Sequence, residues 1–215
     1  MQFEEKMNLT NAEKLIFNSV RLIALKDKVQ IGTGTGFYFC FARTGTTEVR
    51  AIVTNKHVVA GCDSMLAVIN CGSSNPPNIR NNVTITMGPR SYVEHPNSNV
   101  DLCALIISEV AEKMNSAHTP IFAPFATLDD IPSDTEWSNF DAIEDIAMIG
   151  CPNGLYDATA NLPIVRRGVT ASPLANMYNG KNEFMVDMAC FPGSSGSPVY
   201  LYNPFSYYDK KRTQP

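Results

Sequence analysis

Residues 51–60 read AIVTNKHVVA, and this stretch says most about the fold of the chain. Its first four residues are apolar or β-branched, which predicts a buried strand that ends near Thr54. His57 follows this strand end, before a turn of small residues. An imidazole titrates near neutral pH and can serve as a general base and then as a general acid. A single histidine after a strand is more often a packing or surface residue, so its interpretation depends on partners elsewhere in the chain.

Two further segments supply candidate partners for a catalytic site. Residues 100–105 read VDLCAL, in which Asp101 opens an apolar strand, and residues 191–198 read FPGSSGSP, a glycine-rich turn around Ser195. A serine hydroxyl becomes a good nucleophile when a base takes its proton, and a carboxylate fixes the tautomer of that base. Backbone N–H groups at a tight turn can stabilise an oxyanion, and the missing Cβ of Gly193 allows such a turn.

The three segments occur in the order His, Asp, Ser along the chain. This order is typical of chymotrypsin-like enzymes and differs from the orders in subtilisin-like enzymes and α/β-hydrolases. The sequence also lacks the Gly-x-Ser-x-Gly motif of the α/β-hydrolase nucleophile. Each segment alone is a weak signal, since Gly, Ser and Pro clusters also mark ordinary turns. Together they predict a hydrolase with a triad of His57, Asp101 and Ser195.

Short strand-like runs separated by turn residues predict an all-β sandwich or barrel. Residues 113–140 contain three prolines and few regular patterns, so they are expected to connect two groups of strands. Thr10 and Glu13 have the spacing of a capping box, which predicts a short helix from about Asn11. The expected strands are 19–25, 37–41, 49–54, 65–69, 83–87, 102–107, 146–150, 164–170, 184–188 and 198–202.

The composition limits the classes of partner and cofactor. The chain has 215 residues, 44% of them hydrophobic, and a formal net charge of −4, so it can form a sizeable core and has no basic stripe for nucleic acid. Its apolar runs are far shorter than the ~20 residues that span a bilayer, and its acidic N-terminus has no signal-peptide pattern, which predicts a cytoplasmic protein without membrane contact. Six cysteines without a Cys-x-x-Cys pair predict buried reduced thiols, above all Cys40, Cys103 and Cys151, and no metal site or cofactor.

The motifs resemble those of the trypsin-like superfamily of serine peptidases, and most closely its bacterial HtrA/Deg branch. The resemblance extends over roughly residues 19–200 and rests on five motifs in register. They are GTGF at 34–37, VTNKHVV at 53–59, DLCAL at 101–105, IGCPNG at 149–154 and PGSSGSP at 192–198.

The resemblance implies two packed six-stranded antiparallel β-barrels that hydrolyse protein or peptide substrates. A helical segment at 1–18 would precede a first barrel at 19–112, and residues 113–215 would form the linker and the second barrel. The first barrel would supply His57 and Asp101, and the second would supply Ser195.

The same resemblance implies a role for each site residue. Ser195 would be the nucleophile, His57 the general base and acid, and Asp101 the group that orients the imidazole. The backbone N–H groups of Gly193 and Ser195 would form the oxyanion hole.

Three features depart from the family pattern. Ser194 stands where secreted trypsins carry an aspartate that pairs with a new N-terminus, so that zymogen switch is not expected. Ala189 stands where trypsin carries the aspartate that selects Lys or Arg. With Phe191 it forms the predicted substrate pocket, which favours a small or apolar residue. The sequence ends at Pro215, 20 residues after Ser195, which indicates either a fragment of a longer chain or an incomplete second barrel.

Two alternatives remain open from the sequence. The same fold can serve as a peptide-binding or scaffold module with little or no catalysis. It can also be a protease that needs a regulatory protein partner or further strands for activity. The complete set of triad residues favours an enzyme over an inactive module.

Overall fold

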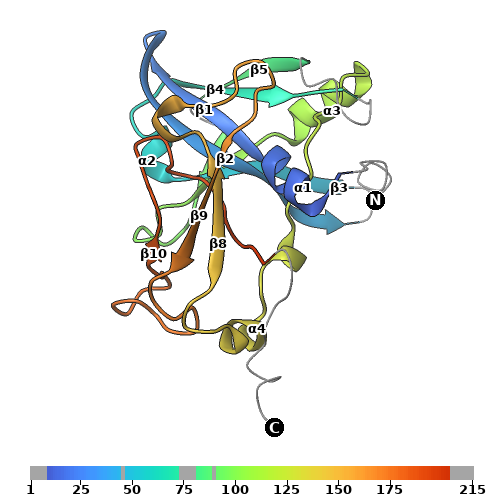
Figure 1. The fold of residues 1–215 in the computed structure, drawn as a ribbon. Helices are drawn as coiled ribbons and strands as arrows, with labels where there is room; N and C mark the ends of the chain where they lie inside the picture. Colours follow the sequence, from blue (N-terminus) through green and yellow to red (C-terminus); the bar gives the residue numbers. More distant parts are fainter. Residues whose placement is uncertain (1–8, 45–46, 73–80, 89–90, 204–215) are drawn as a thin grey trace. The chain divides into compact units, whose positions relative to one another are not determined.

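The computed structural model describes residues 9–44, 47–72, 81–88 and 91–203 (Figure 1). These residues form two β-sheets and several short helices. The chain divides into two compact units that interleave along the sequence. The first comprises residues 1–128, 149–164 and 191–198, and the second comprises residues 129–148, 165–190 and 199–215.

The larger sheet has seven strands in the order β5-β4-β1-β2-β3-β7-β6. Buried and partly exposed residues alternate along β1, which is the period of a strand with one face on the core. Leu22, Ile52, Ile69 and Leu105 are almost completely buried in one apolar core. The strands are β1 (Ser19–Lys26), β2 (Val29–Thr44), β3 (Thr47–Thr54), β4 (Ser64–Asn70), β5 (Asn82–Met87), β6 (Tyr92–Glu94) and β7 (Cys103–Ile106).

Strand β2 is longer than the predicted strand at 37–41, because the glycine-rich residues 32–36 belong to it. A Cβ on Gly34 would lie 2.5 Å from Cγ1 of Val58. Only glycine therefore lets β2 pass this close to helix α2 (Lys56–Val59). Gly34 thus serves close packing beside the short helix.

Helix α1 (Asn11–Asn18) begins at the predicted position. The Thr10 hydroxyl oxygen accepts a hydrogen bond from the backbone N–H of Glu13 at 3.2 Å. The Glu13 carboxylate accepts one from the backbone N–H of Thr10 at 2.7 Å. These reciprocal bonds form a capping box, as the sequence predicts.

Helices α3 (Ser108–Ser116) and α4 (Asp134–Asn139) are not among the predicted elements. The sequence contains a signal for α4, because Ser133 and Glu136 form a second capping box at its start. Nearby prolines obscured that signal. Helix α3 has no such signal, because its first turn has no side-chain cap.

The second sheet has four strands in the order β10-β9-β8-β11. Ile146, Ala147 and Met148 of β8 are buried, and the Thr170 hydroxyl oxygen accepts a hydrogen bond from the backbone N–H of Glu144 at 2.9 Å. The strands are β8 (Asp145–Gly150), β9 (Ile164–Thr170), β10 (Val186–Asp187) and β11 (Val199–Leu201).

The predicted all-β class, with two sheets and a short N-terminal helix, is confirmed. The described residues contain sheets of seven and four strands where two barrels of six were expected, and their pairing order leaves edge strands in both sheets. Strand β6 has three residues, two of them exposed, so it has no apolar period that a sequence could reveal. The domain ranges 1–18, 19–112 and 113–215, and the packing of two barrels, stay predictions.

Candidate active site

His57 lies in the single helical turn α2, directly after strand β3. The neighbouring side chains of Val58 and Val59 are buried, which fixes this turn on the core. The His57 side chain itself is 58% exposed. The imidazole is therefore held in place by its neighbours and is accessible to a substrate.

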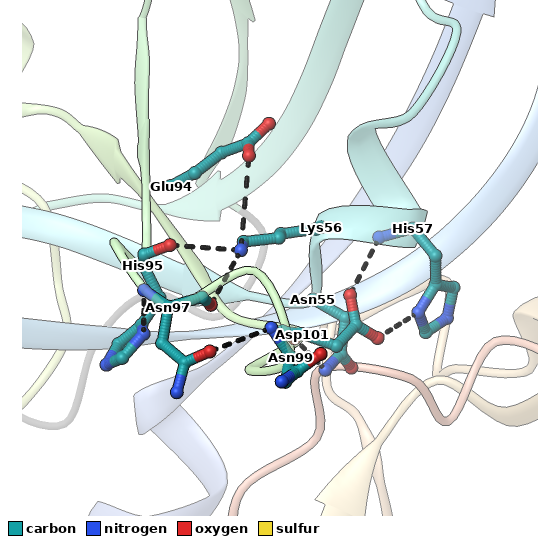
Figure 2. A network of polar contacts seen from close by, with 8 residues as sticks. All are labelled: Asn55, Lys56, His57, Glu94, His95, Asn97, Asn99 and Asp101. Carbon is teal, nitrogen blue, oxygen red and sulfur yellow. Dashed lines mark hydrogen bonds and ion pairs between the residues drawn. The ribbon is translucent and has the colours of Figure 1, made fainter.

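Asp101 contacts His57 from the loop before β7 (Figure 2). Its Oδ2 lies 2.5 Å from Nδ1 of the imidazole, and its Oδ1 accepts a hydrogen bond of 3.1 Å from the backbone N–H of His57. Asn55 holds the backbone of the same residue, because its Nδ2 donates to the Asp101 carbonyl oxygen at 2.6 Å. The structure thus brings together two of the three predicted catalytic residues.

The charge of Asp101 decides the tautomer of His57. Partial burial acts to raise the pKa of Asp101, but hydrogen bonds from the His57 ring and backbone N–H outweigh burial and hold the pKa below its usual value. The carboxylate is therefore ionised at neutral pH and only accepts hydrogen bonds. Nδ1 of a neutral imidazole must donate to it, which leaves Nε2 as a proton acceptor.

Two consecutive tight turns, at residues 191–194 and 194–197, surround Ser195. In each turn the N–H of the fourth residue donates to the carbonyl of the first, at 3.0 and 2.9 Å. Gly193 and Gly196 are the third residues of these turns, with φ of 87° and 83°. A type II turn requires a positive φ at this position, which explains both glycines.

Strand β2 binds the carbonyl groups of these turns. The backbone N–H of Thr35 donates to the Ser195 carbonyl at 2.9 Å, and the Thr35 hydroxyl donates to the Gly193 carbonyl at 2.9 Å. The Thr35 carbonyl accepts a hydrogen bond of 2.7 Å from the hydroxyl of Thr54, at the end of β3. Because Thr54 lies three residues before His57, these bonds fix the Ser195 turns beside the segment that carries the histidine.

The peptide group between Pro192 and Gly193 has a fixed orientation. The backbone N–H of Asn153 donates to the Pro192 carbonyl oxygen at 2.5 Å. The C=O and N–H of a trans peptide point in opposite directions, so the Gly193 N–H points away from Asn153. Within the described ranges, the N–H groups of Gly193 and Ser195 have no hydrogen-bond acceptor.

The Ser195 side chain is less tightly connected than the Asp101–His57 pair. Its Oγ forms no hydrogen bond with any described residue, His57 included. Catalytic hydrogen bonds are often long or poorly aligned in unliganded enzymes and shorten when substrate binds. The adjacent Ser194 differs, because its Oγ accepts a hydrogen bond of 3.3 Å from the backbone N–H of Phe191 within its own turn.

The two predicted pocket residues belong to different compact units. Phe191 is in the first unit and is 46% exposed. Ala189 is in the second unit, where its carbonyl accepts a hydrogen bond of 2.5 Å from Nη1 of Arg166. Their role as a substrate pocket stays a prediction.

Three residues that hold the Ser195 turns were missed by the sequence analysis: Thr35, Thr54 and Asn153. Both threonines are completely buried, yet they lie in the quoted strand motifs. A threonine in a strand gives no sign that its hydroxyl will bind a carbonyl 158 positions further along the chain, as that of Thr35 does. Asn153 acts through its backbone N–H, which any residue except proline supplies.

The remaining titratable side chains that the structure describes give no sign of a metal centre. Cys40, Cys103 and Cys151 are buried as predicted, and no disulfide joins the described cysteines. Burial raises the pKa of Cys103 and of Cys151 to about 11, so both are neutral thiols at physiological pH. In the part of the chain that the structure describes, no three His, Cys, Asp or Glu side chains are grouped to bind a metal ion.

The helices of the described residues are all too short or too polar to span a bilayer.

This fold with a histidine–aspartate pair defines a protein of the trypsin-like class. The chain matches the family model of the trypsin-like peptidase domain over residues 34–203, and it belongs to that family. The predicted membership is thus confirmed.

The chain shares its fold with a solved protease structure. A serine endoprotease from Yersinia pestis is 17% identical with a TM-score of 0.52, and the match covers 90% of this chain and 54% of that one. An inactive form of the Rv3671c protease of M. tuberculosis is 16% identical with a TM-score of 0.46, covering 87% and 73% of the two chains. This chain thus spans about half the length of the Yersinia protein. No curated protein sequence matches it.

Proposed function

We propose that this chain is a serine endopeptidase that hydrolyses peptide bonds through an acyl-enzyme. Ser195 is the nucleophile, His57 the general base and acid, and Asp101 the group that orients the imidazole. The observation that carries this proposal is the 2.5 Å contact between Asp101 Oδ2 and His57 Nδ1. It lies in the same compact unit as the Ser195 turns, and membership of the peptidase family supports it.

The first half of the reaction acylates Ser195. Nε2 of His57 takes the hydroxyl proton as Oγ bonds to the substrate carbonyl carbon. The carbonyl oxygen becomes an oxyanion, which accepts hydrogen bonds from the N–H groups of Gly193 and Ser195. The imidazolium, stabilised by ionised Asp101, then gives its proton to the amine nitrogen as the C–N bond breaks.

The second half returns the enzyme to its starting state. His57 takes a proton from water as the water oxygen attacks the acyl carbon, and it returns that proton to Oγ of Ser195 as the new carboxylic acid leaves. Each step uses side chains of this chain, a peptide and water. The predicted pocket at Ala189 and Phe191 favours a small or apolar residue before the bond that is cut.

Peptide hydrolysis by two serine variants tests the proposal. We expect Ser195→Ala to lower kcat by roughly 10⁶-fold and to leave the circular dichroism spectrum unchanged. Ser197→Ala is the matched control. The Ser197 hydroxyl is buried without a hydrogen-bond partner among the described residues, so its removal leaves no group unpaired and kcat stays at the parent value. A folded Ser195→Ala variant that hydrolyses peptides as fast as the parent would refute the assignment.

One observation favours a second candidate, a site that a regulatory protein partner or a bound peptide completes. Ser195 Oγ and His57 share no hydrogen bond within the described residues. Peptide hydrolysis by the purified chain, measured with and without co-purifying proteins, distinguishes this second candidate from a peptidase that is active alone. Hydrolysis that needs the added proteins indicates a partner-dependent protease. Tight peptide binding without hydrolysis under either condition indicates a binding module.

A further inference from the structure

We propose that Lys56 is a positioning residue for Asp101. The Lys56 ammonium holds the loop of residues 95–101 against the helical turn that carries His57 (Figure 2). The inference rests on the proposed function, because it concerns the same site. Its argument comes from the contacts of a lysine that the triad itself does not use.

The Lys56 ammonium binds the backbone of this loop. Its Nζ donates to the carbonyl oxygens of His95 at 3.0 Å and Asn97 at 3.2 Å. Only 17% of the Lys56 side chain is exposed, whereas the nearby Glu94 carboxylate, 4.0 Å away, belongs to a side chain that is 56% exposed. Ordering a lysine side chain costs conformational entropy, so a fixed and largely buried lysine side chain indicates specific contacts. The two carbonyl oxygens supply them.

The Asn97 carbonyl oxygen links Lys56 to Asp101. It accepts a hydrogen bond from Lys56 Nζ and another, of 3.0 Å, from the backbone N–H of Val100. Val100 directly precedes Asp101 in the chain. The position of the Asn97 carbonyl therefore fixes the backbone from which the catalytic carboxylate extends.

Hydrogen bonds within the loop and at its ends make it compact, so a contact with one part of the loop can hold all of it in place. The N–H of His95 donates to the Leu102 carbonyl at 2.8 Å. The N–H of Asn97 donates to Nδ1 of His95 at 3.2 Å, and the N–H of Asn99 donates to Oδ1 of Asn97 at 3.0 Å. Because these bonds connect the two ends of the loop, its residues move together. A contact that holds the start of the loop therefore also positions the Asp101 carboxylate at its end.

Three consecutive residues thus attach the loop to the strand end. Asn55 binds the carbonyl of Asp101 and His57 binds its carboxylate. Both of these contacts are made at the last residue of the loop. The side chain of Lys56 binds the opposite end, so it determines the direction from which Asp101 reaches the imidazole.

The central test replaces Lys56 with methionine, which has a similar length and no ammonium. We expect Lys56→Met to lower kcat roughly 10- to 100-fold, as small displacements of catalytic groups do, and to leave KM unchanged. Lys56→Arg should recover most of the lost kcat, because a guanidinium can donate to both carbonyls.

Two controls separate this role from general effects of charge. Glu94→Gln removes the exposed ion pair and keeps both carbonyl contacts. Lys113→Met removes a lysine that is 74% exposed and, in the described part of the chain, forms its ion pair with Glu109 on its own helix. Both variants should retain the parent kcat. A loss in Glu94→Gln as large as that in Lys56→Met would overturn the proposal, because the ion pair would then account for the effect.

A second readout tests the loop without measuring activity. Lys56→Met should speed hydrogen exchange of the Val100 amide by about tenfold or more, because its acceptor carbonyl is released. An unchanged exchange rate with unchanged kcat would show that Lys56 is an ordinary surface residue. If Lys56→Met does not fold, Lys56→Gln, whose shorter side chain does not reach the carbonyls, carries the same expectations. Faster exchange in a protein that never hydrolyses peptides would refute the peptidase and leave the positioning role standing.

Discussion

At the scale of single residues, Asp101 acts on His57 through two separate atoms. Oδ2 contacts the imidazole and Oδ1 accepts from the backbone N–H of the same residue. One carboxylate therefore sets both the ring orientation and the position of the helical turn. The hydrogen bonds that lower the pKa of Asp101 are the same ones that place the histidine.

Replacing Asp101 with asparagine separates charge from shape. The amide keeps the size of the carboxylate, but its NH₂ group can face Nδ1 and favour the wrong tautomer. We expect Asp101→Asn to fold and to lose kcat on the order of 10⁴-fold, the typical loss when a triad of this kind loses its carboxylate. Steady-state peptide hydrolysis measures it.

Asp63→Asn is the control for that experiment. The Asp63 carboxylate also accepts a backbone N–H, that of Asp27 at 2.6 Å, and its pKa is also lowered, first by that bond. Its contacts within the described part of the chain do not include His57, Asp101 or Ser195, so its variant should keep the parent kcat. Equal losses in both variants would show that Asp101 has no special role.

Single residues were the easiest part of the site to predict, because proton transfer and nucleophilic attack restrict a position to very few side chains. Type and order led to His57, Asp101 and Ser195, and the structure places the first two in contact, while the catalytic roles of all three stay predictions. Backbone donors such as that of Asn153 could not be predicted, because their role depends on where distant parts of the chain come together. The sequence also placed Lys56 next to His57 without indicating the loop carbonyls that it binds.

At the scale of elements, strand β2 supports the site through Thr35. Its hydroxyl donates to the Gly193 carbonyl and accepts a hydrogen bond of 2.9 Å from the backbone N–H of Cys151. The strand thereby joins the Ser195 turns to the segment that follows β8. Both partners belong to the first compact unit.

Thr35→Val keeps the shape of the side chain and removes the hydroxyl. Two buried backbone groups then lose their partner, which should lower the free energy of unfolding by about 1–3 kcal/mol and slow peptide hydrolysis. Thr33→Val is the matched control, on the same strand but only partly buried, and should change stability by less than about 0.5 kcal/mol. Urea unfolding measures both. Equal stability of the two variants would contradict the supporting role of Thr35.

Elements were predictable where a local pattern exists. The capping box predicted α1, and apolar runs predicted most strands of the larger sheet. The long strand β2 was predicted too short, because its glycines have the composition of a loop. Two of them are explained by long-range packing, since a Cβ would meet Val58 of α2 at Gly34 and Ile52 of β3 at Gly36. Strand β6 forms through pairing with β7, a long-range cause that its own three residues do not encode.

At the scale of the whole molecule, the two compact units differ in their cores. The first buries a large apolar cluster that includes Leu22 and Leu105. In the second, strand β9 exposes Val165 by 46%. The predicted triad lies entirely in the first unit, so its scaffold is the better-packed part of the chain.

Hydrogen exchange should report this difference. Strands with few buried apolar contacts open at lower free energy, so amides of β9 are expected to exchange about tenfold or more faster than those of β1. Native-state exchange followed by mass spectrometry or NMR measures the rates. Equal protection of β1 and β9 would show that the two units unfold as one.

The most direct test of the central claim is labelling with a fluorophosphonate, which reacts only with a serine that a base activates. The account predicts that the parent is labelled on Ser195, as located by peptide mass mapping, and that Ser195→Ala is not labelled at all. Labelling of folded Ser195→Ala to the same extent, or no labelling of the folded parent, would contradict an assembled triad in this chain.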